Sequence, residues 1–146
     1  MTLIEQFAER AEAVSARVVR VKSQAEAEDA VARERERAKA AGLSSDVARA
    51  SCGIAATGTC VVVTDDEETR LATMLPEVSI IVLNASDIVP DLPDIAPFLR
   101  ERQTAGRASY TSFITGPSRT ADIERVSAIG VHGPLELVIV LVEANA

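Results

Sequence analysis

Apolar and polar positions follow one another along the chain in a pattern that predicts alternating helices and strands. Between residues 3 and 14, apolar side chains recur at helical spacing with acidic ones between them, which predicts an amphipathic helix. The β-branched run 16–21 predicts a strand. A second helix is expected over residues 24–41, with Gly42 just past its end. The apolar face of that helix is almost all alanine, so we expect it to pack shallowly.

Further along, the apolar run 78–83 indicates a strand that is buried on both faces, and 135–142 is predicted to be a final buried strand. Asp46 is expected to cap a short helix that reaches Cys52. The remaining predicted elements are strands at 60–64 and 110–115 and helices at 67–74, within 84–103 and at 119–127. Strands separated by helices within 146 residues predict one α/β domain with an open, mainly parallel sheet flanked by helices.

The composition restricts the class of function. The chain carries 15 basic and 22 acidic residues, a net charge of -7, and only 3% of its residues are aromatic. Nucleic-acid binding is therefore not expected, because it needs basic phosphate contacts and, for single strands, aromatic stacking. The longest apolar run, 137–142, is too short to span a bilayer, and Glu5 and Glu9 interrupt any secretory leader. We expect a cytoplasmic protein.

The two cysteines, Cys52 and Cys60, stand eight positions apart and form no Cys-x-x-Cys pair. They do not make a zinc or iron–sulfur ligand set by themselves, so no metal or cofactor is expected in this chain. Two buried free thiols in a reducing compartment and a disulfide between the pair are both compatible with this spacing.

Three glycine-containing turns flank predicted strands, at 57–59, 115–117 and 132–134. Only the second directly follows a strand and precedes a predicted helix, whose free backbone N–H groups would favour an anion. Gly116 allows a tight turn or a close ligand approach there. Arg119 adds a planar guanidinium suited to a carboxylate or a phosphate. The candidate anion or substrate site comprises Thr57, Gly58, Thr59, Gly116, Ser118, Arg119 and Thr120.

The same segment also fits a plain helix cap. Ser118 or Thr120 is able to cap the helix, and Asp122 and Glu124 would stabilise its first turn without a ligand. His132 is the single histidine, and it is a candidate general acid or base or a structural residue bonded to nearby backbone. The chain has no Gly-x-Ser-x-Gly elbow, P-loop or dinucleotide fingerprint.

Four segments, taken in order, resemble signatures of the LUD domain family, with the lactate utilization protein C (YkgG-like) branch as the nearest match. They lie at 53–59 (Gly-Ile-Ala-Ala-Thr-Gly-Thr), 75–80 (Leu-Pro-Glu-Val-x-Ile), 115–124 (Thr-Gly-Pro-Ser-Arg-Thr-Ala-Asp-Ile-Glu) and 130–134 (Gly-Val-His-Gly-Pro). The resemblance covers residues 50–142 of a single domain at 1–146, and 1–45 form a variable helix–strand–helix part.

The chain resembles a short, divergent member of this family. Ala56, Ser79 and Leu135 stand where the family usually has an acidic residue, a histidine and a basic residue. The resemblance implies a fold like that of ribose-phosphate isomerases, glucosamine-phosphate deaminases and CoA transferases. It also implies a role in the oxidation of L-lactate to pyruvate, alongside partner proteins that carry the iron–sulfur clusters.

Two hypotheses for the function follow. In the first, the chain is an accessory subunit of a lactate-oxidising system, in which Arg119 holds a small carboxylate or an acidic partner segment and His132 supports that site. In the second, it is a stand-alone enzyme acting on a small phosphorylated or acyl metabolite, with His132 or Asp122 as acid or base. A LUD-like domain that keeps the fold without a ligand is a third interpretation, and a homo-oligomer is compatible with each.

Overall fold

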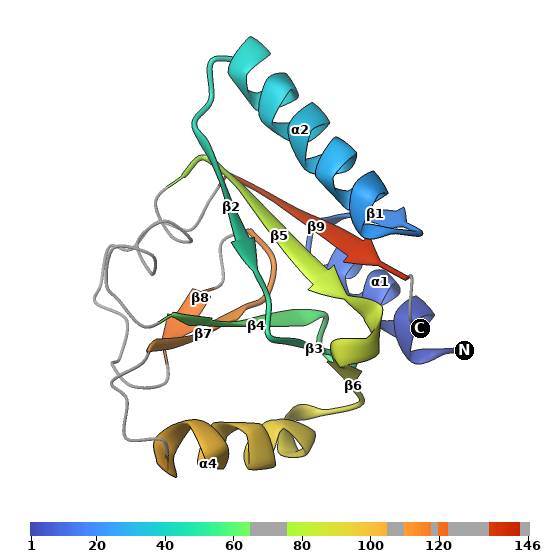
Figure 1. The fold of residues 1–146 in the computed structure, drawn as a ribbon, viewed down its shortest axis with the longest axis vertical. Helices are drawn as coiled ribbons and strands as arrows, with labels where there is room; N and C mark the ends of the chain where they lie inside the picture. Colours follow the sequence, from blue (N-terminus) through green and yellow to red (C-terminus); the bar gives the residue numbers. More distant parts are fainter. Residues whose placement is uncertain (65–75, 105–109, 118–119, 123–134, 144–146) are drawn as a thin grey trace.

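The fold has two sheets packed face to face, with one helix on the outer side of the first sheet and another beside the second (Figure 1). It is taken from a computed structural model that describes residues 1–64, 76–104, 110–117, 120–122 and 135–143. Helix α2 (Gln24–Ala40) covers the outer face of the first sheet, and helix α1 (Leu3–Ala13) lies on its inner face next to the second sheet. No described helix is both long and apolar enough to cross a membrane.

The first sheet is entirely parallel. Its strands lie in the order β1-β9-β5-β2, with β5 and β9 in the centre. The bounds are Arg17–Val21 for β1, Ser45–Arg49 for β2, Val78–Asn84 for β5 and Glu136–Val142 for β9. The central strands are buried on both faces, as their mostly apolar sequences predict, and this confirms the parallel sheet flanked by helices.

The second sheet is an addition that the sequence patterns do not predict. Its strands lie in the order β6-β3-β4-β7-β8, and every pairing is antiparallel except the parallel one between β3 and β6. The bounds are Cys52–Ile54 for β3, Thr59–Thr64 for β4, Ile88–Val89 for β6, Tyr110–Ile114 for β7 and Thr120–Asp122 for β8. Because β3 and β4 follow each other directly, no helix separates them and no parallel crossover forms.

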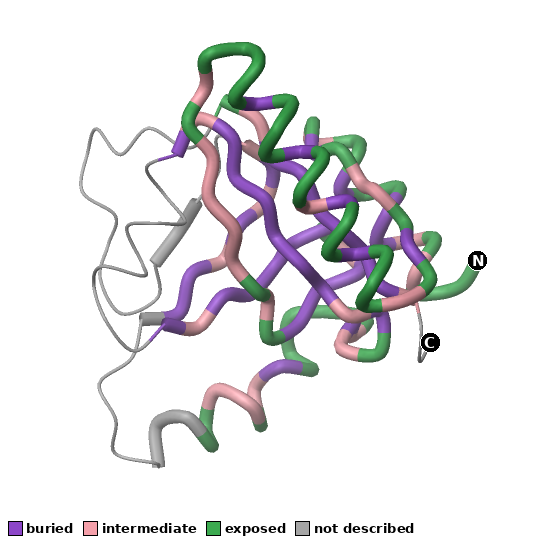
Figure 2. The backbone as a smooth tube through the Cα atoms, turned by 45° about the horizontal axis from the view of Figure 1, so that its top comes forward, coloured by how far each residue is buried: buried purple, intermediate pink, exposed green. Residues whose placement is uncertain are grey.

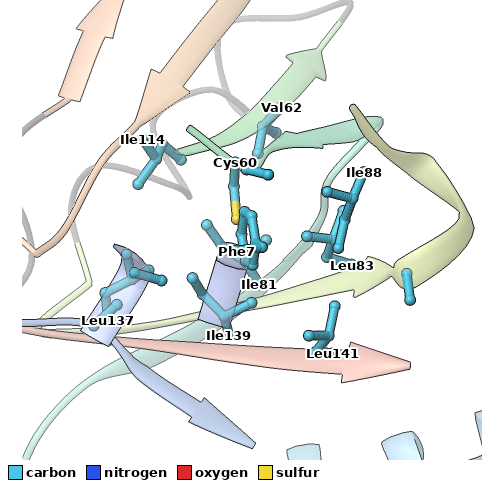
Figure 3. Packing of buried hydrophobic residues seen from close by; sticks show 14 residues of the cluster. Phe7, Cys60, Val62, Ile81, Leu83, Ile88, Ile114, Leu137, Ile139 and Leu141 are labelled. Atoms are coloured by element: carbon cyan, nitrogen blue, oxygen red, sulfur yellow. The ribbon is translucent and has the colours of Figure 1, made fainter. Parts of the chain in front are cut away.

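The main core lies between the two sheets, around Phe7 of α1 (Figure 3). Across the Phe7 ring, the parallel sheet faces the second sheet, with Ile81, Leu83 and Ile139 on one side and Cys60 and Val62 on the other. Alternate residues of the same parallel strands point the other way and form a second cluster under α2. The core is built almost wholly from aliphatic side chains, in line with the low aromatic content.

The two long helices begin and end for local reasons. Thr2 forms a reciprocal capping box with Glu5 at the start of α1, and the Ser23 hydroxyl accepts a hydrogen bond from the Glu26 amide at the start of α2. Gly42 follows α2 with a φ of +75°, a left-handed conformation that glycine adopts at low cost. The buried face of α2 consists of Ala27, Ala30, Glu34 and Ala38, and its small side chains agree with the shallow packing expected from the sequence.

Two predicted helices are wrong where the structure describes them. The segment that Asp46 was expected to cap is strand β2, because Val47 and Ala48 pack on opposite faces of the sheet. Residues 120–122 of the predicted helix 119–127 form β8, which pairs with the end of β7. The connector after β5 contains the short 3-10 helices η1 (Ala85–Asp87) and η2 (Leu92–Ile95) and leads into helix α4 (Ala96–Thr104), which confirms that prediction. The predicted helix 67–74 lies outside the described residues.

Candidate functional site

Two of the three glycine-containing turns come together in the structure. The antiparallel pairing of β4 with β7 sets Cys60 opposite Ile114, so the start of one strand lies beside the end of the other. The Thr59 hydroxyl lies 2.7 Å from the Thr57 hydroxyl and 2.6 Å from the Thr115 hydroxyl. We call these three residues the threonine cluster. Thr59 is 4% exposed, Thr115 is half-buried and Thr57 is exposed, so the cluster leads from the interior to the surface.

The threonine cluster has hydrogen-bonding capacity to spare. Each hydroxyl carries one proton and two acceptor positions, and a chain of three hydroxyls uses two protons for its own two bonds. With respect to the described residues, one proton and several lone pairs of the three hydroxyls remain for a ligand. Because a hydroxyl rotates, the same group is able to donate to a carboxylate or accept from an alcohol. The arrangement suits a small polar ligand with both kinds of group.

The two glycines of these turns are explained by packing against α1. Gly58 has a φ of +67° and Gly116 a φ of +72°. A Cβ at Gly58 would lie 2.4 Å from the backbone nitrogen of Ala11, and one at Gly116 would lie 2.4 Å from the carbonyl oxygen of Val14. The sequence allows Gly116 either a tight turn or a close approach to a ligand, and packing explains the tight turn without a ligand. A binding role for Gly58 or Gly116 stays a prediction.

The rest of the predicted site is only partly described. Ser118, Arg119 and His132 lie outside the described residues, as does the turn 132–134. Thr120 and Asp122 belong to β8, where they stand opposite Ile114 and Ser112. Since no helix begins at Thr120, both the helix-cap explanation and the anion site at a helix start lose their structural basis. The roles of Arg119, His132 and Asp122 remain predictions that rest on the chemistry of their side chains.

Apart from the threonine cluster, a hollow lies at the carboxyl edge of the parallel sheet, where ligands commonly bind in such folds. It has a volume of about 770 Å³ and is lined by residues at the start of α1, in η1 and just after β9. Its charged residue, Glu143, is engaged by Arg20 through two hydrogen bonds of 2.9 Å, which hold the pKa of that carboxyl below its usual range. This hollow could not be predicted from the sequence, because residues from both ends of the chain and from its middle form it.

One carboxylate is buried beneath α2. Glu34 is 6% exposed and forms ion pairs with Arg17 of β1 and Arg37 of its own helix, and Glu136 of β9 pairs with the same two arginines. Burial alone would raise the pKa of Glu34, but its hydrogen bonds to the arginines outweigh burial and hold the pKa below its ordinary value. With each charge matched, this cluster joins α2 to two strands.

Both cysteines are free thiols, which settles the choice that the sequence left open. Cys60 stands opposite Gly53, the neighbour of Cys52, so the two side chains point to opposite faces of the second sheet. Burial raises the pKa of Cys52 to about 11 and that of Cys60 to about 12. Among the described residues no group of three His, Cys, Asp or Glu side chains is placed to hold a metal ion.

Comparison with known proteins gives the class of the fold. The sequence signature of the LUD domain matches residues 31–142, which include the whole threonine cluster. A solved structure of a DUF162 family protein from Deinococcus radiodurans superimposes with a TM-score of 0.69 over 96% of both chains, at 18% sequence identity, and so shares the fold. This chain belongs to the LUD domain family.

Comparison with individual curated proteins shows which members of the family this chain is similar to. The chain is 36% identical over 99 residues to Uncharacterized protein YkgG of Escherichia coli (strain K12), across 66% of this chain and 43% of that protein. It is 33% identical over 108 residues to Lactate utilization protein C 1 of Bacillus mycoides (strain KBAB4), across 73% and 45%. Against Lactate utilization protein C of Geobacillus thermodenitrificans (strain NG80-2) the identity is 35% over 91 residues, across 61% and 38%. The matched segment spans less than half the length of each of these relatives.

Proposed function

We propose that this LUD domain is an accessory component of lactate utilization, which supports the oxidation of L-lactate to pyruvate together with separate iron–sulfur proteins. The observation that carries the proposal is the family match over 31–142, combined with relatives named Lactate utilization protein C at 33% and 35% identity. In this arrangement the iron–sulfur clusters reside on the partner proteins. The geometry of Cys52 and Cys60 supports that division, because the two side chains lie on opposite faces of the second sheet and do not converge on one metal ion.

We further propose that the threonine cluster contributes to a site for a small carboxylate. A 2-hydroxy acid or a 2-oxo acid presents carboxylate oxygens and an oxygen on the adjacent carbon, and rotating hydroxyls suit both. Buried Thr59 would hold the hydroxyls of Thr57 and Thr115 in place from behind. Arg119 is proposed as the charged anchor of the carboxylate because its planar guanidinium suits that group, and His132 is proposed as its support.

Calorimetric titration of the purified chain with L-lactate and with pyruvate tests the ligand. We expect Arg119→Gln to weaken binding about tenfold or more, because a hydrogen bond to a charged group contributes about 1.5–3 kcal/mol. Thr57→Val, at the exposed end of the threonine cluster, should weaken it by a smaller factor. Arg33→Gln, on the exposed face of α2 and across the parallel sheet from the threonine cluster, is the matched control and should leave binding unchanged.

Size-exclusion chromatography of the chain mixed with the iron–sulfur proteins of a lactate-utilization system tests the partnership. A shared elution peak is expected. A chain that binds neither acid and elutes apart from those proteins would refute the proposal. Turnover of a sugar phosphate or an acyl-CoA that is lost in His132→Ala would replace it with the stand-alone enzyme.

A further inference from the structure

An apolar groove runs between α2 and the edge strand β2. It encloses about 300 Å³, and most of its lining is apolar: Ala27 and Val31 of α2, Val47 of β2 and Val82 of β5. Figure 2 shows the cause, since β2 is half-buried along most of its length whereas its neighbour β5 is buried. Because α2 covers β2 only in part, an apolar surface continuous with the cluster under the helix is left open beside this edge strand.

Two arginines line the same groove. Arg35 comes from α2 and Arg49 is the last residue of β2. Arg17, Arg20 and Arg37 all form ion pairs, but neither groove arginine has a hydrogen-bonding or ion-pair partner among the described residues. Glu28 is the one acidic residue in the lining, so positive charge is in excess there although the whole chain carries -7.

One end of the groove lies at the carboxyl edge of the parallel sheet. Gln24, the first residue of α2, donates a hydrogen bond of 2.9 Å from its side-chain nitrogen to the side-chain oxygen of Asn84, the last residue of β5. Gln24 also lines the groove, and Arg49 ends β2 at the same edge. Ligands of parallel α/β sheets bind outside this edge. Apolar lining and the unpaired Arg49 therefore lie at the edge where the topology favours a ligand, and Arg35 lines the groove further along α2.

We propose that this groove binds a small amphipathic anion, whose acyl or aromatic body lies on the valine and alanine surface while its carboxylate meets Arg35 and Arg49. The volume is at the lower end of the range of small-molecule sites, roughly 300–1,000 Å³, which suits a medium-chain acyl or aromatic acid rather than a larger cofactor. The site uses none of the threonine cluster, so it stands independently of the lactate role.

A fluorescent apolar anion, anilinonaphthalene sulfonate, is the probe for a titration of the folded full chain. Fluorescence should saturate at one probe per chain, and octanoate should displace the probe while octylamine does not. Arg35→Gln and Arg49→Gln should each weaken octanoate binding about threefold to tenfold, because these arginines are exposed and partly screened. Glu28→Gln should tighten it, since that change removes the opposing charge.

Two further variants separate the groove from general effects. Ala32 lines the groove and is exposed, so Ala32→Leu should block binding without disturbing the core. Arg33 is exposed on the same helix outside the groove, and Arg33→Gln should change binding less than twofold. The proposal is overturned if Ala32→Leu and both groove arginine variants bind the probe unchanged, or if octylamine competes as well as octanoate. A concentration-dependent dimer that Ala32→Leu abolishes would assign the groove to a second copy and would overturn it equally.

Discussion

The substitution Gly58→Ala measures how tightly the turn before β4 packs against α1. With a φ of +67°, an alanine at this position is strained by about 1–2 kcal/mol before any contact is considered. Its Cβ would also lie 2.4 Å from the nitrogen and 2.7 Å from the Cα of Ala11, and 2.7 Å from the carbonyl carbon of Arg10. Ordinary contacts between carbon atoms are about 3.5–4.0 Å, and these are backbone atoms of a helix that cannot rotate away.

The helix or the turn must therefore shift by roughly 1 Å, and overpacking of this kind costs about 1–3 kcal/mol. The total loss in the free energy of unfolding is expected to be about 2–5 kcal/mol. Gly42→Ala is the matched control, because Gly42 has a similar φ of +75° and a Cβ there would meet nothing within 4 Å. It should lose only the conformational part, about 1–2 kcal/mol.

Urea unfolding of both variants, followed by far-ultraviolet circular dichroism, gives the two losses. The difference between them isolates the steric cost, and in thermal melts each kcal/mol should lower the midpoint by about 3–5 °C for a domain of this size. Equal losses in Gly58→Ala and Gly42→Ala would refute the close approach of the turn to α1. Gly58→Ala should also disturb the threonine cluster, so its ligand binding should fall with its stability.

Three further predictions concern buried polar groups. Glu34→Gln should cost about 1–2 kcal/mol near neutral pH, a figure discounted because the paired arginines are nearly half exposed. Because the pKa of Glu34 is lowered, its carboxylate stabilises the fold fully above the pKa of the unfolded chain, and this contribution is lost as pH falls through the folded pKa. In urea titrations the cost of Glu34→Gln should therefore shrink at about pH 3. An equal cost at neutral pH and at about pH 3 would contradict the direction of the pKa shift. Cys52 and Cys60 should react with Ellman's reagent only on unfolding, and rapid labelling of two thiols in the native chain would contradict their burial. Thr64→Val should stabilise by about 0.5–1.5 kcal/mol in urea titrations, because the Thr64 hydroxyl is buried without a hydrogen-bond partner among the described residues; a loss of stability would show that it has one.

Much of the local structure could be predicted because its cause is local. The predicted helix at 3–14 is α1, and the strand predicted at 135–142 corresponds to β9, because its apolar run 137–142 favours a strand buried on both faces. Gly42 ends α2 through its own left-handed conformation. Each of these outcomes depends on periodicity or on a cap within a few residues.

The misses have non-local causes. Residues 45–49 carry an aspartate followed by valine and alanine, which is compatible with a capped helix, yet pairing with β5 more than thirty positions away makes them a strand. Residues 120–122 pair with β7 in the same way. The candidate site changed with them, because an anion site at a helix start requires a helix that the described residues do not form.

The sequence by itself determined the α/β class, the central parallel strands and the family, since periodicity and short motifs are properties of neighbouring residues. Only the tertiary structure decided that the strands divide into two sheets, that Thr59 joins Thr57 to Thr115, and that Gly58 is required by the backbone of α1. The groove beside α2 belongs to the same group, because Arg35 and Arg49 line one groove only when β2 joins the edge of the parallel sheet. Such contacts join residues far apart in the chain, and their energy depends on packing that no local pattern encodes.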